Sequence, residues 1–118
     1  MTMLQELAAQ SQAYFEKSTA IIAEAWELQQ KFYTDFGERQ VECYKAISDE
    51  RLSSYQKMQQ AQTPAQAFEA NAAFEEHALE RLQQLHEANV DAFQQLQQSL
   101  NALYFRSSKA PASPADPD

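Results

Sequence analysis

The side chains that most often carry out chemistry in helical proteins are present in this chain, but not at the spacing that chemistry needs. Two helical Glu-x-x-His motifs would predict a carboxylate-bridged di-metal centre, yet Phe74 and Gln83 stand three residues before His77 and His86. Cys43 is the single cysteine, and its position on a helical apolar pattern predicts a small buried side chain rather than a nucleophile. We therefore expect no catalytic residue, no metal ligand, no cofactor and no enzymatic activity.

The elements that would position any site are helices. The 118 residues include one glycine and four prolines, which leaves little turn chemistry for hairpins or sheets. Thr63, Pro64 and Gln66 have the spacing of an N-cap, a first helical residue and a capping box. The sequence predicts an all-α fold of two long amphipathic helices, over about residues 4–60 and 64–105. We expect them to form an elongated helical hairpin that assembles by coiled-coil packing.

The predicted domain organisation is simple. Residues 1–105 should form a single all-helical domain, whereas residues 106–118 are small, polar and proline-rich and are expected to be a disordered tail. Gly37 is the weak point of the first helix, because glycine costs about 1 kcal/mol relative to alanine inside a helix. The sequence leaves open whether the helix continues through Gly37 or is kinked there.

The charge balance limits the partners. The net charge is −8, and the nine lysines and arginines are spread singly along the chain. Nucleic-acid binding needs clustered cations, and docking on an anionic bilayer needs a polar face rich in Lys and Arg. No apolar run approaches the length of a membrane span and no basic leader precedes one. We expect no nucleic acid, no membrane span and a cytoplasmic location.

The apolar face between Tyr14 and Phe36 is unusually wide. On a helical projection it covers about 160°, whereas a helix with one neighbour needs somewhat more than about 100°. Such a helix has surface for a second neighbour, which could be an apolar surface outside the protein or the core of an oligomer. The candidate contact residues are Phe15, Ile22, Trp26, Phe32, Tyr33 and Phe36.

The second predicted helix has a period of seven residues, which is typical of a coiled coil. His86 and Asn89 place two polar residues in the middle of this pattern, either tolerated at a solvated point or fixing register and oligomer number. Under the second reading, Asn89→Leu would raise stability and blur the oligomer size. The candidate oligomer seam consists of Leu79, Leu82, His86, Asn89, Phe93, Leu96, Leu100 and Leu103.

A hairpin of two helices would leave much of both patterns uncovered, because each helix buries only one stripe against the other. Several hundred Å² of apolar surface is more than soluble monomers usually expose. We therefore expect self-association, adsorption to an apolar surface, or an exchange between the two.

The order of these features resembles a known family. An amphipathic helix bearing aromatic residues, the segment Gln60-Ala61-Gln62-Thr63-Pro64-Ala65-Gln66-Ala67-Phe68-Glu69, a coiled-coil helix rich in Ala, Gln and Glu, and a short Ala/Pro tail look like the bacterial phasins. The resemblance implies a non-enzymatic protein that coats the hydrophobic polyester surface of cytoplasmic polyhydroxyalkanoate granules and influences granule size and number. It also implies a homo-oligomer, a tetramer or dimer. The alternatives are a structural or adaptor coiled coil that binds a protein partner, and a holdase-like chaperone.

Overall fold

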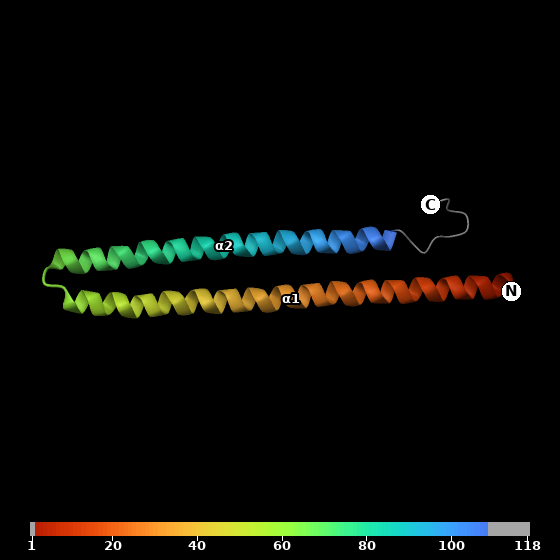
Figure 1. Ribbon diagram of the computed structural model, residues 1–118, viewed down its shortest axis with the longest axis horizontal. Helices are drawn as coiled ribbons and strands as arrows, with labels where there is room; N and C mark the ends of the chain where they lie inside the picture. The colour runs from red at the N-terminus through yellow and green to blue at the C-terminus, as the bar shows by residue number, and fades with distance from the viewer. Residues whose placement is uncertain (1, 109–118) are drawn as a thin grey trace. The chain divides into compact units, whose positions relative to one another are not determined.

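The chain folds into two helices joined by a short turn. The computed structural model describes residues 2–108, in which α1 spans Met3–Gln60 (58 residues) and α2 spans Pro64–Ser108 (45 residues). Figure 1 shows both helices and the connection between them at residues 61–63. The predicted all-α fold of two long helices packed as a hairpin is confirmed, and the described residues contain no strand.

The start of α2 is fixed by the capping chemistry that the sequence predicts. The Thr63 hydroxyl accepts a hydrogen bond from the backbone N–H of Gln66 at 3.2 Å. The Gln66 side chain in turn accepts one from the backbone N–H of Gln62 at 2.8 Å. A comparable pair at Thr2 and Gln5 caps α1, where Thr2 Oγ1 accepts from the Gln5 N–H at 3.3 Å. Both helices therefore begin where side chains satisfy their first unpaired N–H groups.

The helix bounds differ little from the predicted ones. α1 is a single helix through Gly37, so the glycine does not interrupt it. α2 continues to Ser108, three residues past its predicted end, so residues 106–108 are helical rather than part of a tail. The rest of the predicted tail, residues 109–118, lies outside the described residues.

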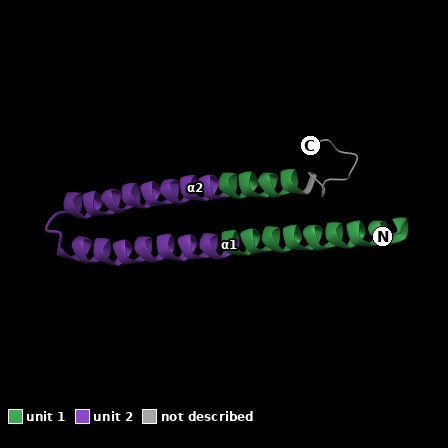
Figure 2. Cartoon of the chain, turned by 45° about the vertical axis from the view of Figure 1, so that its right-hand side comes forward, with its two compact units in different colours: residues 1–32, 93–118 green, residues 33–92 purple. Residues whose placement is uncertain are grey.

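The two helices contribute to two compact units, coloured separately in Figure 2. Unit 2 comprises residues 33–92, and unit 1 combines the preceding part of α1 with the part of α2 from Phe93 onward. Within each unit the segment of α1 runs antiparallel to the segment of α2.

Polar side chains join the two helices of unit 2. Arg39 Nε donates to Asn89 Oδ1 at 3.0 Å, and Asn89 Nδ2 donates to Gln40 Oε1 at 3.2 Å. Arg51 Nη1 donates to Asn71 Oδ1 at 2.8 Å. These bonds fix the register of α1 against α2, because each of them joins side chains on the two facing helices and Asn89 bonds two of them at once.

Unit 1 is held by different contacts. The rings of Phe32 and Phe93 lie 6.2 Å apart between centroids and are tilted by 60°, a favourable arrangement for an aromatic pair. Arg106 on α2 forms an ion pair with Glu24 on α1. This pair is more than half exposed, so it adds little to stability.

Neither unit has an enclosed core. Of the residues whose exposure is described, 2–106, only Leu103 and Ser54 are buried, each with 5% of its surface exposed. One of these two is polar. Two packed helices therefore leave most large apolar side chains in contact with solvent.

Candidate surface-binding faces

Rows of exposed large side chains run along both helices of unit 2. On α1 the row consists of tyrosines, and on α2 it is mainly aliphatic. Each exposed side chain comes directly after a residue that is turned toward the other helix, as Tyr44 follows Cys43 and Leu79 follows Ala78. The rows consist of Tyr33, Tyr44 and Tyr55 on α1 and Phe68, Leu79, Leu82, His86 and Val90 on α2.

The two rows lie on the same side of unit 2. One residue along a helix turns the side chain by about 100°. Viewed from one end of the unit, this turn is clockwise in one helix and anticlockwise in the other, because the segments are antiparallel. The side of α1 that faces α2 and the side of α2 that faces α1 point in opposite directions. The two opposite turns therefore bring both rows to the same side of the unit. These rows form the apolar face of unit 2.

Unit 1 has a corresponding face. Ile22 and Trp26 follow Ile21 and Ala25 on α1, and Tyr104 follows the buried Leu103 on α2. The same geometry places both rows on one side of this unit. We call Phe15, Ile22, Trp26, Phe93 and Tyr104 the apolar face of unit 1; all five are at least half exposed.

The side chains of these faces recur every eleven residues. Within unit 2 the spacing joins Tyr33, Tyr44 and Tyr55 on α1 and Phe68, Leu79 and Val90 on α2, and within unit 1 it joins Phe93 with Tyr104. Eleven residues make three turns of a nearly straight helix, so a row with this period stays on one side. Val90 and Tyr104 were missed because α2 reads as a seven-residue pattern. The eleven-residue spacing was the signal that would have found them.

The opposite side of unit 2 is polar. Its side chains come one residue before those that face the other helix, so they are turned by about 100° in the other sense. Glu42 and Lys57 of α1 lie there with His77 and Gln84 of α2, lining shallow hollows between the helices. Unit 2 is therefore amphipathic across its thickness, with large apolar side chains on one side and polar ones on the other.

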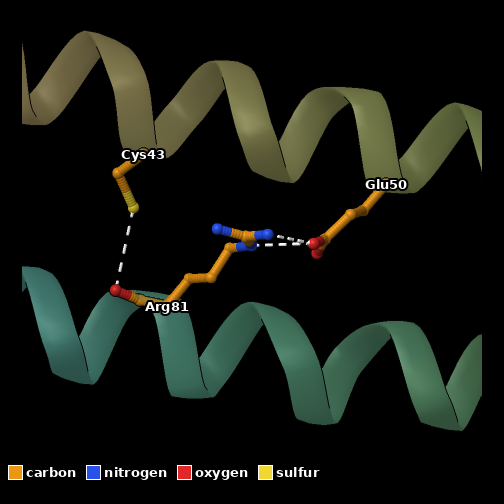
Figure 3. Close-up of polar contacts among 3 residues, drawn as sticks. All are labelled: Cys43, Glu50 and Arg81. Atoms are coloured by element: carbon orange, nitrogen blue, oxygen red, sulfur yellow. Dashed lines mark hydrogen bonds and ion pairs between the residues drawn. The ribbon is translucent and has the colours of Figure 1, made fainter.

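The interior of unit 2 mixes small and charged groups with a few large apolar side chains, such as the half-buried Phe74. Figure 3 shows Arg81 of α2 between Cys43 and Glu50 of α1. Arg81 Nε donates to Glu50 Oε1 at 2.8 Å, and the Cys43 thiol donates to the Arg81 carbonyl at 3.8 Å. Ser54 Oγ donates to the carbonyl of Ala70 at 3.4 Å. Burial of these groups contributes much less than burial of Leu or Phe would.

Electrostatics in this interior centre on the Arg81–Glu50 pair. The hydrogen bond from Arg81, and then its charge, lower the pKa of the Glu50 carboxyl. The same interaction raises the pKa of Arg81. Within the described residues, Glu50 Oε2 and Arg39 Nη2 are buried without a hydrogen-bond partner, and such atoms lower stability. The interior of unit 2 therefore combines stabilising pairs with unpaired polar atoms.

The structure divides the six candidate contact residues of α1 into two groups. Phe15, Ile22, Trp26 and Tyr33 are exposed and belong to the apolar faces. Phe32 and Phe36 are half-buried, and Phe32 packs against Phe93. The wide arc in the sequence thus corresponds to two adjacent stripes, one turned to α2 and the other to solvent.

The candidate oligomer seam of α2 is also divided. Leu79, Leu82, His86 and Phe93 are exposed, whereas Leu103 is buried against the other helix. Asn89, Leu96 and Leu100 are half-buried, and Asn89 bonds Arg39 and Gln40 of the same chain. The exposed part of the seam is available to a second molecule.

Metal ligands and membrane spans provide no further candidate among the described residues. These residues contain no group of three or more His, Cys, Asp or Glu side chains placed to hold a metal ion. Nor does either helix, as far as it is described, have a stretch apolar enough to cross a membrane. The two apolar faces are therefore the strongest candidate functional sites, and they indicate that the protein binds partners.

Comparison of the chain with known protein families, with curated proteins and with solved structures finds no match.

Proposed function

We propose that the protein is a non-enzymatic amphiphilic coat protein, which adsorbs through its apolar faces to the hydrophobic surface of intracellular polyester granules, of the polyhydroxyalkanoate kind. The observation that carries this proposal is the placement of the large side chains. Trp26, Ile22 and Leu79 are exposed, while Ser54, Cys43 and Arg81 lie between the helices. A helix pair made only to fold would place its large apolar groups inside.

Adsorption would remove this apolar surface from water. Burying apolar area contributes about 25 cal/mol per Å², so each large side chain would contribute about 1.5–3 kcal/mol if fully covered. A nearly flat hydrophobic surface needs no matching pocket and contacts a whole row at once. The polar side of each unit, with side chains such as Glu42 and Gln84, would then face water.

The charge favours a polymer surface over a lipid bilayer. Amphipathic segments that bind anionic bilayers carry Lys and Arg beside the apolar face. This chain has 17 acidic and nine basic residues. The acidic excess would make coated particles repel one another, which would limit coalescence and so influence granule size and number. The resemblance to phasins, which rests on the Thr63-Pro64 helix start and the order of the helices, supports the same function and a cytoplasmic location on granules.

Self-association is the expected state of the protein away from a granule. The apolar faces, including Leu79, Leu82 and Phe93, would be covered in a dimer or tetramer. The same exposed part of α2 also supports the second candidate function, an adaptor that binds a helix of another protein, because spaced leucines suit a helical neighbour.

The test compares two exposed aliphatic residues of α1. Ile22 lies on the apolar face of unit 1 and is 69% exposed. Leu52 is 60% exposed but comes two residues after Glu50, so it is turned about 200° from the α2-facing side, away from that helix. We expect Ile22→Gln to weaken adsorption to poly(3-hydroxybutyrate) particles by about tenfold, and Leu52→Gln by less than about twofold.

Adsorption is measured as loss of protein from solution over a range of particle concentrations. The single tryptophan, Trp26, gives a second readout, because its emission should shift to shorter wavelength when the face leaves water. Equal effects of Ile22→Gln and Leu52→Gln, or an unchanged Trp26 spectrum on mixing, would rule out the coat function and leave the adaptor.

A further inference from the structure

The outer flank of α1, the side turned away from α2, has a shallow hollow in unit 2. It is lined by Tyr33, Thr34, Gly37, Glu38, Val41 and Glu42. Thr34, Glu38 and Val41 each come two residues after a half-buried residue, so they are turned by about 200° from the α2-facing side. Gly37 directly follows the half-buried Phe36, as the residues of the apolar face do, so the hollow borders that face at Tyr33 and Gly37 and extends from there onto the outer flank.

Gly37 creates the hollow, and nothing within the chain requires a glycine there. Its φ is not positive, so another residue could take the same backbone conformation. A Cβ atom built on Gly37 would meet no atom within 4 Å. Glycine inside a helix costs about 1 kcal/mol relative to alanine. The fold pays this cost without a packing benefit from its own residues.

The two carboxylates beside the hollow are a second local cost. Glu38 and Glu42 are four residues apart on one helix, a spacing at which like charges destabilise by about 0.2–0.5 kcal/mol. In the described part of the chain, neither carboxylate has a hydrogen-bond or ion-pair partner, and both residues are exposed. Departures from local rules without an internal benefit are characteristic of functional positions.

The spacing fits a helical neighbour. Thr34, Gly37, Glu38 and Val41 follow the pattern i, i+3, i+4 and i+7, which is the outline of a hole that receives one side chain from a facing helix. With no side chain on Gly37, the backbone of the neighbour can approach closely.

We propose that this hollow receives a lysine or arginine side chain from a helix of a different, basic protein. The aliphatic part of that side chain would lie over Gly37 against Tyr33 and Val41, and its charged end would reach Glu38 and Glu42. Among the twenty side chains, lysine and arginine combine an aliphatic part that suits the apolar floor with a positive charge that suits the carboxylates at its rim.

A second copy of this chain fits the hollow poorly. In the described part of α2 the only Lys or Arg side chains are Arg81 and Arg106, which are paired with Glu50 and Glu24. A second α1 would bring Lys31 and Lys45 together with the same two carboxylates, and the net charge of −8 on each copy opposes the approach of a second one. Charge complementarity therefore favours a basic partner over self-association at this position.

The probe is a synthetic 18-residue amphipathic helix of leucine and lysine, titrated into the full-length protein by calorimetry, with a leucine and glutamate peptide for comparison. Gly37→Leu fills the hollow, leaves the charge unchanged and replaces a poor helix former with a good one. We expect it to weaken binding of the lysine peptide by about tenfold. Glu38→Gln with Glu42→Gln should weaken binding similarly, and the glutamate peptide should not bind.

The matched control is Glu76→Gln with Glu80→Gln. These exposed carboxylates have the same four-residue spacing and lie on the outer flank of α2, but Glu75 stands before them where Gly37 precedes Glu38. This double variant should bind the lysine peptide within about twofold of the wild type. Equal losses of peptide affinity in the two double variants would show general attraction to an acidic surface. An unchanged peptide affinity of Gly37→Leu would show that the hollow is not used. Either result overturns the proposal.

Two further measurements separate this proposal from the others. If Gly37→Leu alters the sedimentation of the protein alone without changing peptide affinity, the occupant is a second copy and the proposal is wrong. Adsorption of Gly37→Leu to polyester particles should be no weaker than that of the wild type, because the added leucine brings apolar area to the edge of the apolar face. The coat function can therefore fail while peptide binding holds, and the reverse.

Discussion

At the scale of single residues, Asn89 has a structural role within the chain. Its side chain accepts a hydrogen bond from Arg39 Nε and donates one to Gln40 Oε1. One of the two interpretations that the sequence left open was that Asn89 sets the register between molecules, whereas these contacts set the register between α1 and α2. The helix that Asn89 contacts belongs to its own molecule and not to a second one.

The effect expected of Asn89→Leu is therefore reversed. The leucine would leave Arg39 Nε without an acceptor beside Arg39 Nη2, which already lacks one. We expect the free energy of unfolding to fall by about 1–3 kcal/mol, measured by urea denaturation followed by circular dichroism. Asn101→Leu is the control, since Asn101 is exposed on the same helix, and it should change stability by less than about 0.5 kcal/mol. A more stable Asn89→Leu would restore the intermolecular interpretation.

The Glu50–Arg81 pair makes stability depend on pH. The hydrogen bond and the charge of Arg81 lower the pKa of the Glu50 carboxyl in the folded state, whereas an unfolded glutamate has a pKa of about 4.3. A depressed folded pKa stabilises the protein above the unfolded pKa, and this contribution is lost as the pH falls through the folded pKa. Glu50→Gln should therefore be less stable than the wild type at neutral pH, with a difference that disappears in strong acid.

Urea midpoints measured across this acid range would test the pH dependence. Glu76→Gln is the control, because Glu76 is an exposed carboxylate outside this pair, and its difference from the wild type should not show the same dependence on pH. A Glu50→Gln difference that stays constant from neutral to acidic pH would show that the ion pair does not contribute.

At the scale of elements, both helices use adjacent residues for different neighbours. In α1, Ile21 and Ile22 follow one another, the first half-buried and the second exposed. Ala78 and Leu79 do the same in α2. A helix that turns one stripe to its partner and the next to an outside surface needs a wide apolar arc, since the stripes are about 100° apart.

Gly37 provides a test at the scale of one helix, because glycine is a poor helix former and lies inside α1. Because a Cβ there meets open space, Gly37→Ala should raise the free energy of unfolding by about 1 kcal/mol. Thermal or urea unfolding by circular dichroism would measure the change. Ala20→Gly, at an exposed position of the same helix, should lower stability by a similar amount. If Gly37→Ala is instead destabilising, glycine is required for folding and the cost assigned to it is wrong.

At the scale of the whole molecule, the charge and the apolar faces act together. An acidic excess of eight charges opposes close approach of molecules, whereas exposed side chains such as Trp26 and Leu79 favour association. An uncharged apolar surface can cover the exposed side chains without the electrostatic repulsion that a second copy of the protein would bring. This balance is the physical basis of the proposed coat function, in which the charges remain in water and the apolar faces do not.

The sequence by itself determined the secondary structure. One glycine among 118 residues and the Thr63-Pro64 start of α2 specify two helices and the turn between them through local chemistry. The same local information located the exposed positions Phe15, Ile22, Trp26 and Tyr33, because they belong to a wide apolar arc. Periodicity shows which residues share a side of one helix, but not which neighbour that side meets.

Only the tertiary structure decided how each arc is divided. Phe32 contacts Phe93, while Tyr33, one residue later, remains exposed. The periodicity of the sequence cannot tell which of these two stripes faces α2 and which faces solvent. The pairing of Arg39 with Asn89 joins residues 50 positions apart, so it depends on the register of α1 against α2. Once the antiparallel packing within each unit is known, the rows of both helices fall on one side, because the direction of the chain sets the sense of every helical turn.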